Sequence, residues 1–268
     1  MASARKGPIR IGVGGWTYEP WRGVFYPSDL PHKRELEYMS RKLTSIEVNG
    51  TFYRGQSRDS YAKWRDETPD GFVFALKGPR YATHRRVLAE ARESIERFVG
   101  GGVAELGDKL GPINWQFPPT KRFEVDDFAA FLDLLPRSID GRPLRHAVET
   151  RHDSFRCAEF VALARDKGVA IVAAADSEYP QIADPTAAFV YLRIMGTADS
   201  EPAGYAAAAL DVWAKRAKTW AAGGAPKDHP LLTKAPSAPD GREVYLYVIS
   251  GHKERNPAAA MALIERLR

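Results

Sequence analysis

The chain has 268 residues, of which 44% are hydrophobic and 27% are charged, and it has one cysteine, Cys157. This composition is typical of a folded domain and excludes a disordered chain, while the single cysteine excludes an internal disulfide and a cysteine-based metal cluster. The formal net charge of +5 favours an anionic small molecule or a nucleic acid as partner. No apolar stretch has the length of a membrane span and the N-terminus lacks a secretory signal, so we expect a cytoplasmic protein with no membrane partner, and a monomer.

Strand-like and helix-like segments alternate along the chain. Short β-branched and apolar runs predict eight strands, at residues 9–13, 44–48, 72–76, 113–117, 146–148, 169–173, 189–194 and 244–249. Apolar residues at helical spacing predict helices at residues 35–43, 57–67, 87–99, 125–135, 157–167, 205–222 and 257–267. This order predicts an α/β fold.

A single (β/α)8 TIM barrel is the predicted architecture. Strands that alternate with helices pair in parallel through right-handed crossovers, and eight such units close into a barrel of roughly 250 residues. We expect the barrel to span residues 9–268, after a flexible N-terminal segment at residues 1–8. An open doubly wound sheet is the alternative, but the sequence has no obvious switch point for it.

Two long connections interrupt the alternation. Residues 14–33 follow the first strand and carry the aromatic residues Trp16, Tyr18, Trp21, Phe25 and Tyr26. As a βα-loop, this segment belongs on the C-terminal face, where barrels hold their active sites. Residues 223–242 are rich in Pro and Gly and precede the last strand, which predicts a flexible surface insertion on the opposite face with no catalytic role.

Polar residues follow nearly every predicted strand at the same end. Glu47, Lys77 and Glu149 interrupt or end apolar strands, and a lysine buried beside two carboxylates could supply a general acid and a general base. These three are the predicted catalytic residues. The alternative is a structural network of ion pairs that closes the top of the barrel.

The predicted substrate-binding residues surround this set. Arg54, Arg80, Arg151 and Arg193 could jointly hold an anion, because guanidinium groups bind phosphate and carboxylate in pairs of hydrogen bonds. Trp16 could stack on a sugar or a base, or could simply anchor its loop. The other predicted binding residues are Asn49, Tyr53, His84, Gln116 and His152.

A divalent metal is a possible cofactor. His84 and His152 could join Glu47, Glu149 or Asp176 as ligands, since imidazole and carboxylate groups from several strand ends can bind such an ion. The sequence has no HxH or HExxH pair. The identity of any metal stays unknown.

Several segments, in order along nearly the whole chain, resemble the YecE-like family, a TIM-barrel family that carries a domain of unknown function (family number 72). They are IGVGGWTYEPWRGVFYP (11–27), IEVNGTFYR (46–54), TPDGFVFALKGPRYATH (68–84), LGPINWQFPP (110–119), AVETRHDSF (147–155), YLRIMG (191–196) and VYLYV (244–248). The resemblance implies a barrel but no established reaction. Its motif residues fall on Trp16, Glu47, Asn49, Tyr53, Lys77, Pro79, His84, Gln116, Glu149, Arg151, His152 and Arg193.

The chain departs from the family pattern in three places, one of which is the 223–242 insertion, which is longer than is usual in the family. Asp153 and Phe155 stand where the family usually has Pro and Trp, and the turn at residues 250–253 replaces an asparagine-rich turn.

Three functions are compatible with these residues. The first is a hydrolase or phosphoryl-transfer enzyme for a phosphorylated or nucleic-acid-like anionic substrate, bound at the C-terminal mouth of the barrel. The second is a metal-free enzyme, hydrolase or isomerase in type, that acts on a sugar or small acid through Glu47, Glu149 and Lys77. The third is a non-catalytic module that binds a ligand or partner in the mouth.

Overall fold

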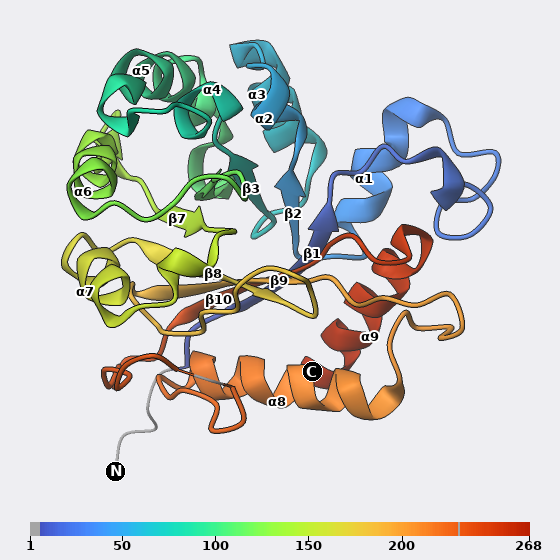
Figure 1. Ribbon diagram of the computed structural model, residues 1–268. Coiled ribbons are helices and arrows are strands. Elements are labelled where there is room, and N and C mark those ends of the chain that lie inside the picture. Colours follow the sequence, from blue (N-terminus) through green and yellow to red (C-terminus); the bar gives the residue numbers. More distant parts are fainter. Residues whose placement is uncertain (1–5, 230) are drawn as a thin grey trace.

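Eight parallel strands form a closed barrel in the computed structural model, which describes residues 6–229 and 231–268 (Figure 1). The strands are β1 (Ile9–Gly14), β2 (Ser45–Val48), β3 (Val73–Lys77), β4 (Leu110–Gln116), β7 (His146–Glu149), β8 (Ala170–Ala175), β9 (Phe189–Ile194) and β10 (Glu243–Val248). They are hydrogen-bonded in the order β1-β10-β9-β8-β7-β4-β3-β2, and β2 pairs with β1 to close the barrel. The predicted TIM barrel is confirmed.

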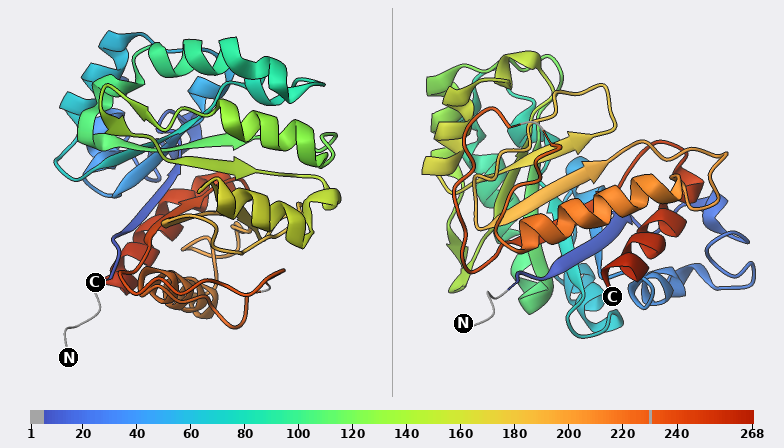
Figure 2. Two further views of the ribbon diagram at one scale, coloured as in Figure 1. Left: turned by 90° about the vertical axis from the view of Figure 1, so that its left-hand side faces the viewer. Right: turned by 90° about the horizontal axis from the view of Figure 1, so that it is seen from below.

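Helices surround the strands, as the sequence predicts. The longer ones are α1 (Glu35–Ser40), α3 (Arg58–Glu67), α5 (Arg92–Gly100), α6 (Val125–Leu134), α7 (Ala158–Asp166), α8 (Ala207–Ala221) and α9 (Asn256–Leu267). Short helices occur within the loops: α2 (Gly50–Tyr53), α4 (Arg80–Thr83) and the 3-10 turns η1 (Glu19–Trp21), η2 (His32–Arg34), η3 (Leu88–Ala91), η4 (Val103–Lys109), η5 (Asp153–Phe155) and η6 (Lys253–Arg255). An antiparallel hairpin, β5 (Ser138–Ile139) with β6 (Arg142–Pro143), was not predicted. Helices α8 and α9 lie together beside β1 and β10 (Figure 2).

Alternation along the strands divides the core into two parts. Outward residues such as Phe74 and Leu76 pack with the helices, whereas Val73 and Ala75 belong to a separate cluster inside the barrel. Aromatic side chains fill much of this interior: Phe189, Tyr191, Tyr245 and Tyr247. They form a floor beneath the C-terminal ends of the strands, so polar residues at those ends lie on a packed base.

The connection from β8 to β9 lacks the helix that a regular barrel would have. Residues 176–188 are all described and contain no helix. Instead, the buried carboxylate of Asp184 accepts hydrogen bonds from the backbone N–H groups of Leu232 and Thr233, each at 2.8 Å, and from the Thr233 hydroxyl at 2.6 Å. Nearby, His229 is buried against Trp213 and Trp220 of α8. Residues 176–188 and the segment at 223–242 thus fill the place of the missing helix.

The expected insertion at 223–242 is held by the contacts with Asp184 and also by hydrogen bonds within the segment itself. The buried guanidinium of Arg242 donates to the carbonyl oxygens of Gly223 and Gly224 and contacts that of Pro236. Its flexibility and lack of a catalytic role stay predictions, and residue 230 lies outside the described residues.

The expected flexible N-terminal segment, residues 1–8, lies mostly outside the described part of the chain, which begins at residue 6. Within that part, Gly7 N–H donates to the carbonyl of Ala221 and Pro8 accepts from Val244 N–H. None of the described helices combines the length and the apolar character needed to cross a bilayer.

Candidate functional site

A buried guanidinium joins two buried carboxylates at the barrel mouth. Arg193, near the end of β9, places Nη1 2.7 Å from Oε2 of Glu149 and Nη2 3.1 Å from Oε1 of Glu47. Glu47 and Glu149 are fully buried and Arg193 is 3% exposed. All three strands deliver these side chains inward because they occupy the inward positions of the alternating pattern.

Two further side chains complete the hydrogen bonding of the carboxylates. The Tyr191 hydroxyl donates to Oε2 of Glu47 at 2.6 Å. The Asn114 amide nitrogen lies 3.2 Å from Oε2 of Glu149 and 3.5 Å from Oε2 of Glu47. Every carboxylate oxygen of Glu47 and Glu149 therefore has a donor, whereas Arg193 Nε and Asn114 Oδ1 are buried without a hydrogen-bond partner.

A second group of cations meets at one neutral oxygen. Oε1 of Gln116 accepts from Lys77 Nζ at 2.7 Å, from Arg151 Nη2 at 2.9 Å and from Arg193 Nη1 at 3.4 Å. Arg151 also binds Glu149, with Nη2 2.7 Å from its Oε1. Within the described residues, Lys77 has no carboxylate at ion-pair distance, and its other close neighbour is the ring of Phe52, 4.3 Å away.

Burial and neighbouring charges shift the pKa values of Glu149 and Lys77. Burial alone would raise the pKa of Glu149, but Arg193, Arg151 and Lys77 outweigh it and lower that pKa to about 2. Burial, with the neighbouring Arg193, lowers the pKa of Lys77 from 10.5 to about 8. Glu149 is therefore held ionised, while Lys77 can exchange a proton near neutral pH.

Local structure fixes the backbone of Lys77. The Thr51 hydroxyl, from α2, donates to the carbonyl of Lys77 at 2.8 Å and lies 3.2 Å from its N–H group. Residue 78 is glycine because a Cβ there would lie 2.3 Å from the ring of Trp115. The strand end therefore holds the lysine at a defined position.

His84 lies on the solvent side of this cluster. It follows α4, contacts Phe52 at a ring distance of 5.5 Å and is exposed. Burial of part of the ring and the positive charges of Arg80, Lys77 and Arg151 lower its pKa. The imidazole is thus neutral at pH 7 and available to accept a proton.

The predicted lysine does lie near the two carboxylates, and both of them influence its pKa. Their ion pairs, however, are with Arg193 and Arg151. The four arginines do not converge: Arg193 is neutralised by two carboxylates, and Arg54 and Arg80 are exposed on the loops after β2 and β3.

His152 stays outside the network. Its Nδ1 accepts from the backbone N–H of Ser154 at 3.1 Å and lies 2.9 Å from the hydroxyl of that residue. The imidazole thus caps the η5 turn, which is a structural use of this side chain.

Trp16 and Asn49 line a cavity of about 380 Å³ at the β1 and β2 side of the mouth. Lys253 also lines it, with Nζ 3.9 Å from the centre of the Tyr18 ring. The aromatic loop is anchored at this point, since Trp21 Nε1 donates to the carbonyl of Lys253 at 2.9 Å. The cavity offers an aromatic wall and an amine.

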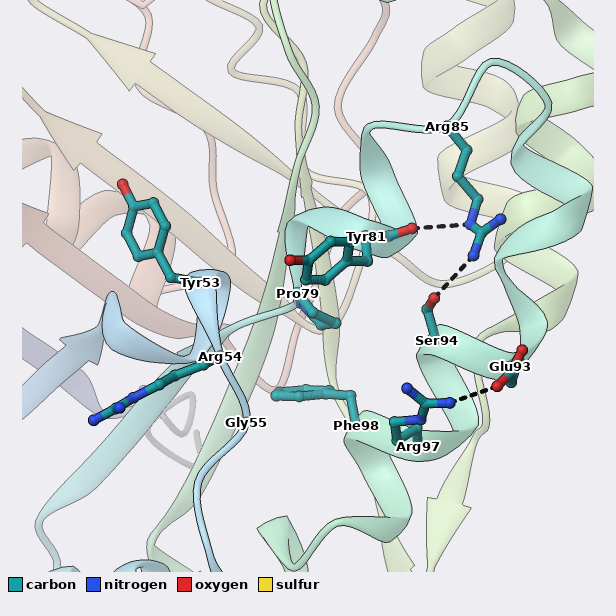
Figure 3. A pocket seen from close by; sticks show the side chains of 10 residues that line it. All are labelled: Tyr53, Arg54, Gly55, Pro79, Tyr81, Arg85, Glu93, Ser94, Arg97 and Phe98. Atoms are coloured by element: carbon teal, nitrogen blue, oxygen red, sulfur yellow. Dashed lines mark hydrogen bonds and ion pairs between the residues drawn. The ribbon is translucent and has the colours of Figure 1, made fainter.

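Tyr53 and Arg54 line a different cavity of about 390 Å³ at the outer rim, between α2 and α5 (Figure 3). Arg80 lies nearby, 5.4 Å from the ring centre of Tyr81. These predicted binding residues are therefore separated from the buried group at the mouth. That group, called the Arg193 cluster below, consists of Glu47, Lys77, Asn114, Gln116, Glu149, Arg151, Tyr191 and Arg193.

The mouth offers no obvious metal ligand set. Across residues 6–229 and 231–268, no group of three or more His, Cys, Asp or Glu side chains is placed to hold a metal ion. Asp176 instead accepts from the Tyr205 hydroxyl at 3.1 Å.

Two strained residues lie at the same end of the barrel. Asp176 follows β8 with φ of 54°, and Ser250 follows β10 with φ of 59°. Side chains other than glycine rarely adopt this conformation, and such strain is concentrated at functional sites.

Alternation could have found two residues that the sequence interpretation missed. Asn114 stands two positions before Gln116, and Tyr191 two positions before Arg193, so each shares the inward face of its strand. Tyr179 gave no such signal. It lies in the irregular segment after β8, where its ring stacks 4.2 Å from the Arg151 guanidinium.

Comparison with known sequences agrees with the architecture. A family model described as "Protein of unknown function DUF72" matches residues 10–268. The UPF0759 protein YecE of Escherichia coli K12 is 27% identical over 148 residues, and the UPF0759 protein YunF of Bacillus subtilis is 28% identical over 116 residues. The first match covers 55% of this chain and 50% of YecE, and the second covers 41% of this chain and 40% of YunF.

Three solved structures share the fold over 97% or more of this chain. A DUF72 family protein from Thermotoga maritima superposes with a TM-score of 0.71 and 20% identity, covering 97% of this chain and 98% of that one. A DUF72 family protein from Enterococcus faecalis gives 0.67 and 14%, with 99% of each chain covered. A xylose isomerase-like TIM barrel/4-hydroxyphenylpyruvate dioxygenase fusion protein gives 0.51 and 12%, covering 98% of this chain and 44% of that one.

Proposed function

The chain belongs to the DUF72 family, and from the side chains at its barrel mouth we propose that it is an enzyme for a small substrate with a terminal phosphate or other anionic group. Lys77 binds the anion and exchanges a proton during the reaction. Arg193, Glu47 and Glu149 hold the mouth in shape. Hydrolysis or transfer of a phosphoryl group is the reaction type that this arrangement favours.

The observation that carries the proposal is the contact between Lys77 and Gln116. Three cationic side chains surround the single amide oxygen of Gln116, and an amide oxygen carries no formal charge to balance them. The cluster holds three cations, Lys77, Arg151 and Arg193, against the two carboxylates of Glu47 and Glu149. A buried surplus of positive charge is costly, and an anionic ligand would relieve that cost.

The burial of the cluster favours a small substrate over a polymer. Lys77 is 6% exposed, Gln116 is 8% exposed and Arg193 is 3% exposed. Only a narrow terminal group could reach cations placed this deeply. A nucleic-acid backbone would instead need a row of accessible cations along its path.

The pKa values support a role for Lys77 in proton transfer. A group whose pKa is about 8 can both hold and release a proton near neutral pH, as acid–base catalysis requires. His84 is exposed and its lowered pKa keeps it neutral, so it can act as the base. Glu149, with its pKa at about 2, is poorly suited to donate a proton.

The arrangement is less favourable for a glycosidase with two catalytic carboxylates. Glu47 and Glu149 both lie within reach of the same Asn114 nitrogen, so their separation is well below the roughly 10 Å limit for such enzymes. The guanidinium of Arg193, however, bridges the two groups and neutralises both. Neither carboxylate is left to act as the general acid.

A non-catalytic anion-binding protein is the second candidate. The ion pairs of Arg193 favour it, because they hold Glu47 and Glu149, two of the three predicted acid–base residues. A measurement of substrate turnover distinguishes this candidate from the enzyme.

The test combines binding with turnover. Isothermal titration calorimetry with sulfate and with inorganic phosphate should show binding that Lys77→Met abolishes and that Lys63→Met, an exposed lysine paired with Glu67, leaves unchanged. A panel of phosphate monoesters then reports hydrolysis. Binding without turnover of any ester would favour the non-catalytic candidate. Unchanged sulfate binding in Lys77→Met would refute the proposal.

A further inference from the structure

A cavity at the rim of the barrel has a composition different from that of the mouth. It has a volume of about 390 Å³ and is bounded by the turn after α2, the segment that includes α4, and one face of α5. We call it the rim pocket, and its lining residues are Tyr53, Arg54, Gly55, Pro79, Tyr81, Arg85, Glu93, Ser94, Arg97 and Phe98 (Figure 3). This volume falls within the range of small-molecule sites.

Arg85 presents a fixed guanidinium to the rim pocket. Its Nε donates to the carbonyl of Tyr81 at 2.9 Å and its Nη2 to the hydroxyl of Ser94 at 3.2 Å (Figure 3). Both acceptors are neutral, and no carboxylate of the described residues lies at ion-pair distance from Arg85. The remaining N–H groups are therefore available in a defined orientation, which is what recognition of an anion requires.

The second cation of the rim pocket is paired. Arg97 contacts Glu93 at 2.5 Å, and both side chains are largely exposed. This exposed pair contributes little and can rearrange around a ligand. Arg54 extends away from the other labelled side chains in Figure 3. Arg85 is thus the cation that defines the charge of the rim pocket.

Aromatic rings make up the rest of the lining. Tyr53 and Tyr81 are 63% and 59% exposed, which is unusual for rings of this size. Phe98 is buried and, with Pro79, adds apolar surface to the lining (Figure 3). Exposed rings beside an apolar surface are suited to stacking on a flat ligand.

We propose that the rim pocket binds a small flat aromatic molecule that carries a phosphate or carboxylate. Arg85 receives the anionic group, and Tyr53 and Tyr81 contact the ring. The two ligand sources that share this chemistry are nucleoside monophosphates and aromatic carboxylic acids. The rim pocket is lined by none of the residues of the Arg193 cluster, so its occupancy does not depend on the reaction proposed for the mouth.

The experiment measures binding of four probes to the full chain by isothermal titration calorimetry: AMP, adenosine, 4-hydroxybenzoate and inorganic phosphate. AMP or 4-hydroxybenzoate should bind more tightly than adenosine and phosphate, and the stronger of the two identifies the source. Arg85→Met should weaken the better probe by about tenfold, as expected for loss of a charge-assisted contact. Tyr81→Ala should weaken it through loss of the ring contact.

Two controls keep the result specific. Arg86→Met removes an exposed arginine next in sequence that does not line the rim pocket, and it should leave the affinity unchanged. Lys77→Met tests the mouth in the same assay. Loss of binding in Lys77→Met with Arg85→Met unaffected would place the probe in the mouth and overturn the proposal, as would failure of both ring probes to bind. A melting curve for each variant confirms that it folds, and the milder Tyr81→Leu replaces Tyr81→Ala if the latter does not.

Discussion

Arg193 and Glu149 form an ion pair of 2.7 Å in which the carboxylate is fully buried and the arginine is 3% exposed. The pair spans β9 and β7, which are separated in the barrel by β8. It therefore lies across the inside of the barrel. The same guanidinium reaches Glu47 on β2, so one side chain connects three strands.

Removal of this guanidinium should strongly destabilise the fold. In Arg193→Met, two buried carboxylates lose their partner, and breaking such a pair costs about 3–5 kcal/mol. Urea denaturation measures the free energy of unfolding. Arg92→Met, which removes one side of the exposed pair with Glu96, should change it little. Similar free energies of unfolding for the two variants would show that Arg193 does not stabilise the fold.

Acid should weaken the wild-type protein more than a Glu149→Gln variant. Glu149 has a folded pKa of about 2 against an ordinary 4.5. A lowered carboxyl pKa contributes stability that is complete above the ordinary value and is lost as the pH falls toward the folded one, here about 3 kcal/mol. Urea denaturation from about pH 5 to pH 2.5 should show a shallower loss in the variant. The exposed Glu93→Gln should retain the wild-type slope, and equal slopes for all three proteins would contradict the expected ion pair.

Sulfate binding should weaken as the pH rises past about 8. The pKa of Lys77 lies near that value, and the neutral amine no longer attracts the anion, whereas sulfate keeps its charge throughout. Lys77→Arg should bind sulfate with little change between about pH 7 and pH 9.5, because a guanidinium stays protonated there. A wild-type decline that persists in Lys77→Arg would assign the titration to another group.

Gly223→Ala should destabilise the chain more than Gly141→Ala. Both glycines have a positive φ, of 85° and 75°, so each alanine is strained by about 1 kcal/mol. At Gly223 a Cβ would also lie 1.8 Å from the carbonyl oxygen of Ala238, whereas at Gly141 the space is open. Melting temperatures of the two variants provide the comparison. Equal shifts would mean that the 223–242 segment moves aside freely.

The sequence predicted the strands well because their signals are local. Phe189–Ile194 was located to the residue because FVYLRI is rich in aromatic and aliphatic residues, although it contains Arg193. Strand β4 begins at Leu110, three residues before the predicted start. The prediction started late because Gly111 and Pro112 are typical of a break in a strand. The register with β3 shifts at this point, and such an irregularity accommodates a proline in a strand.

The candidate site was predicted in position but not in pairing. Alternation placed Glu47 inside the barrel, and the strand ends placed Lys77, Gln116, Glu149 and Arg193 at one mouth. The choice of Arg193 as the partner of both carboxylates depends on the order in which the strands close the barrel. That is a property of the whole fold, and no local pattern in the sequence encodes it.

Between β8 and β9, two irregular segments, residues 176–188 and 223–242, stand where a regular barrel has a helix. This arrangement has a consequence for biosynthesis. Asp184 leaves the ribosome 48 residues before Leu232, its first backbone donor in the folded protein. A helix in this position would have satisfied its own polar groups as it formed. Here Asp184 meets its backbone donors only after residue 233 has been made, so this part of the barrel wall stays incomplete until late in synthesis. We expect the nascent chain to be most open to chaperones and proteases during that interval.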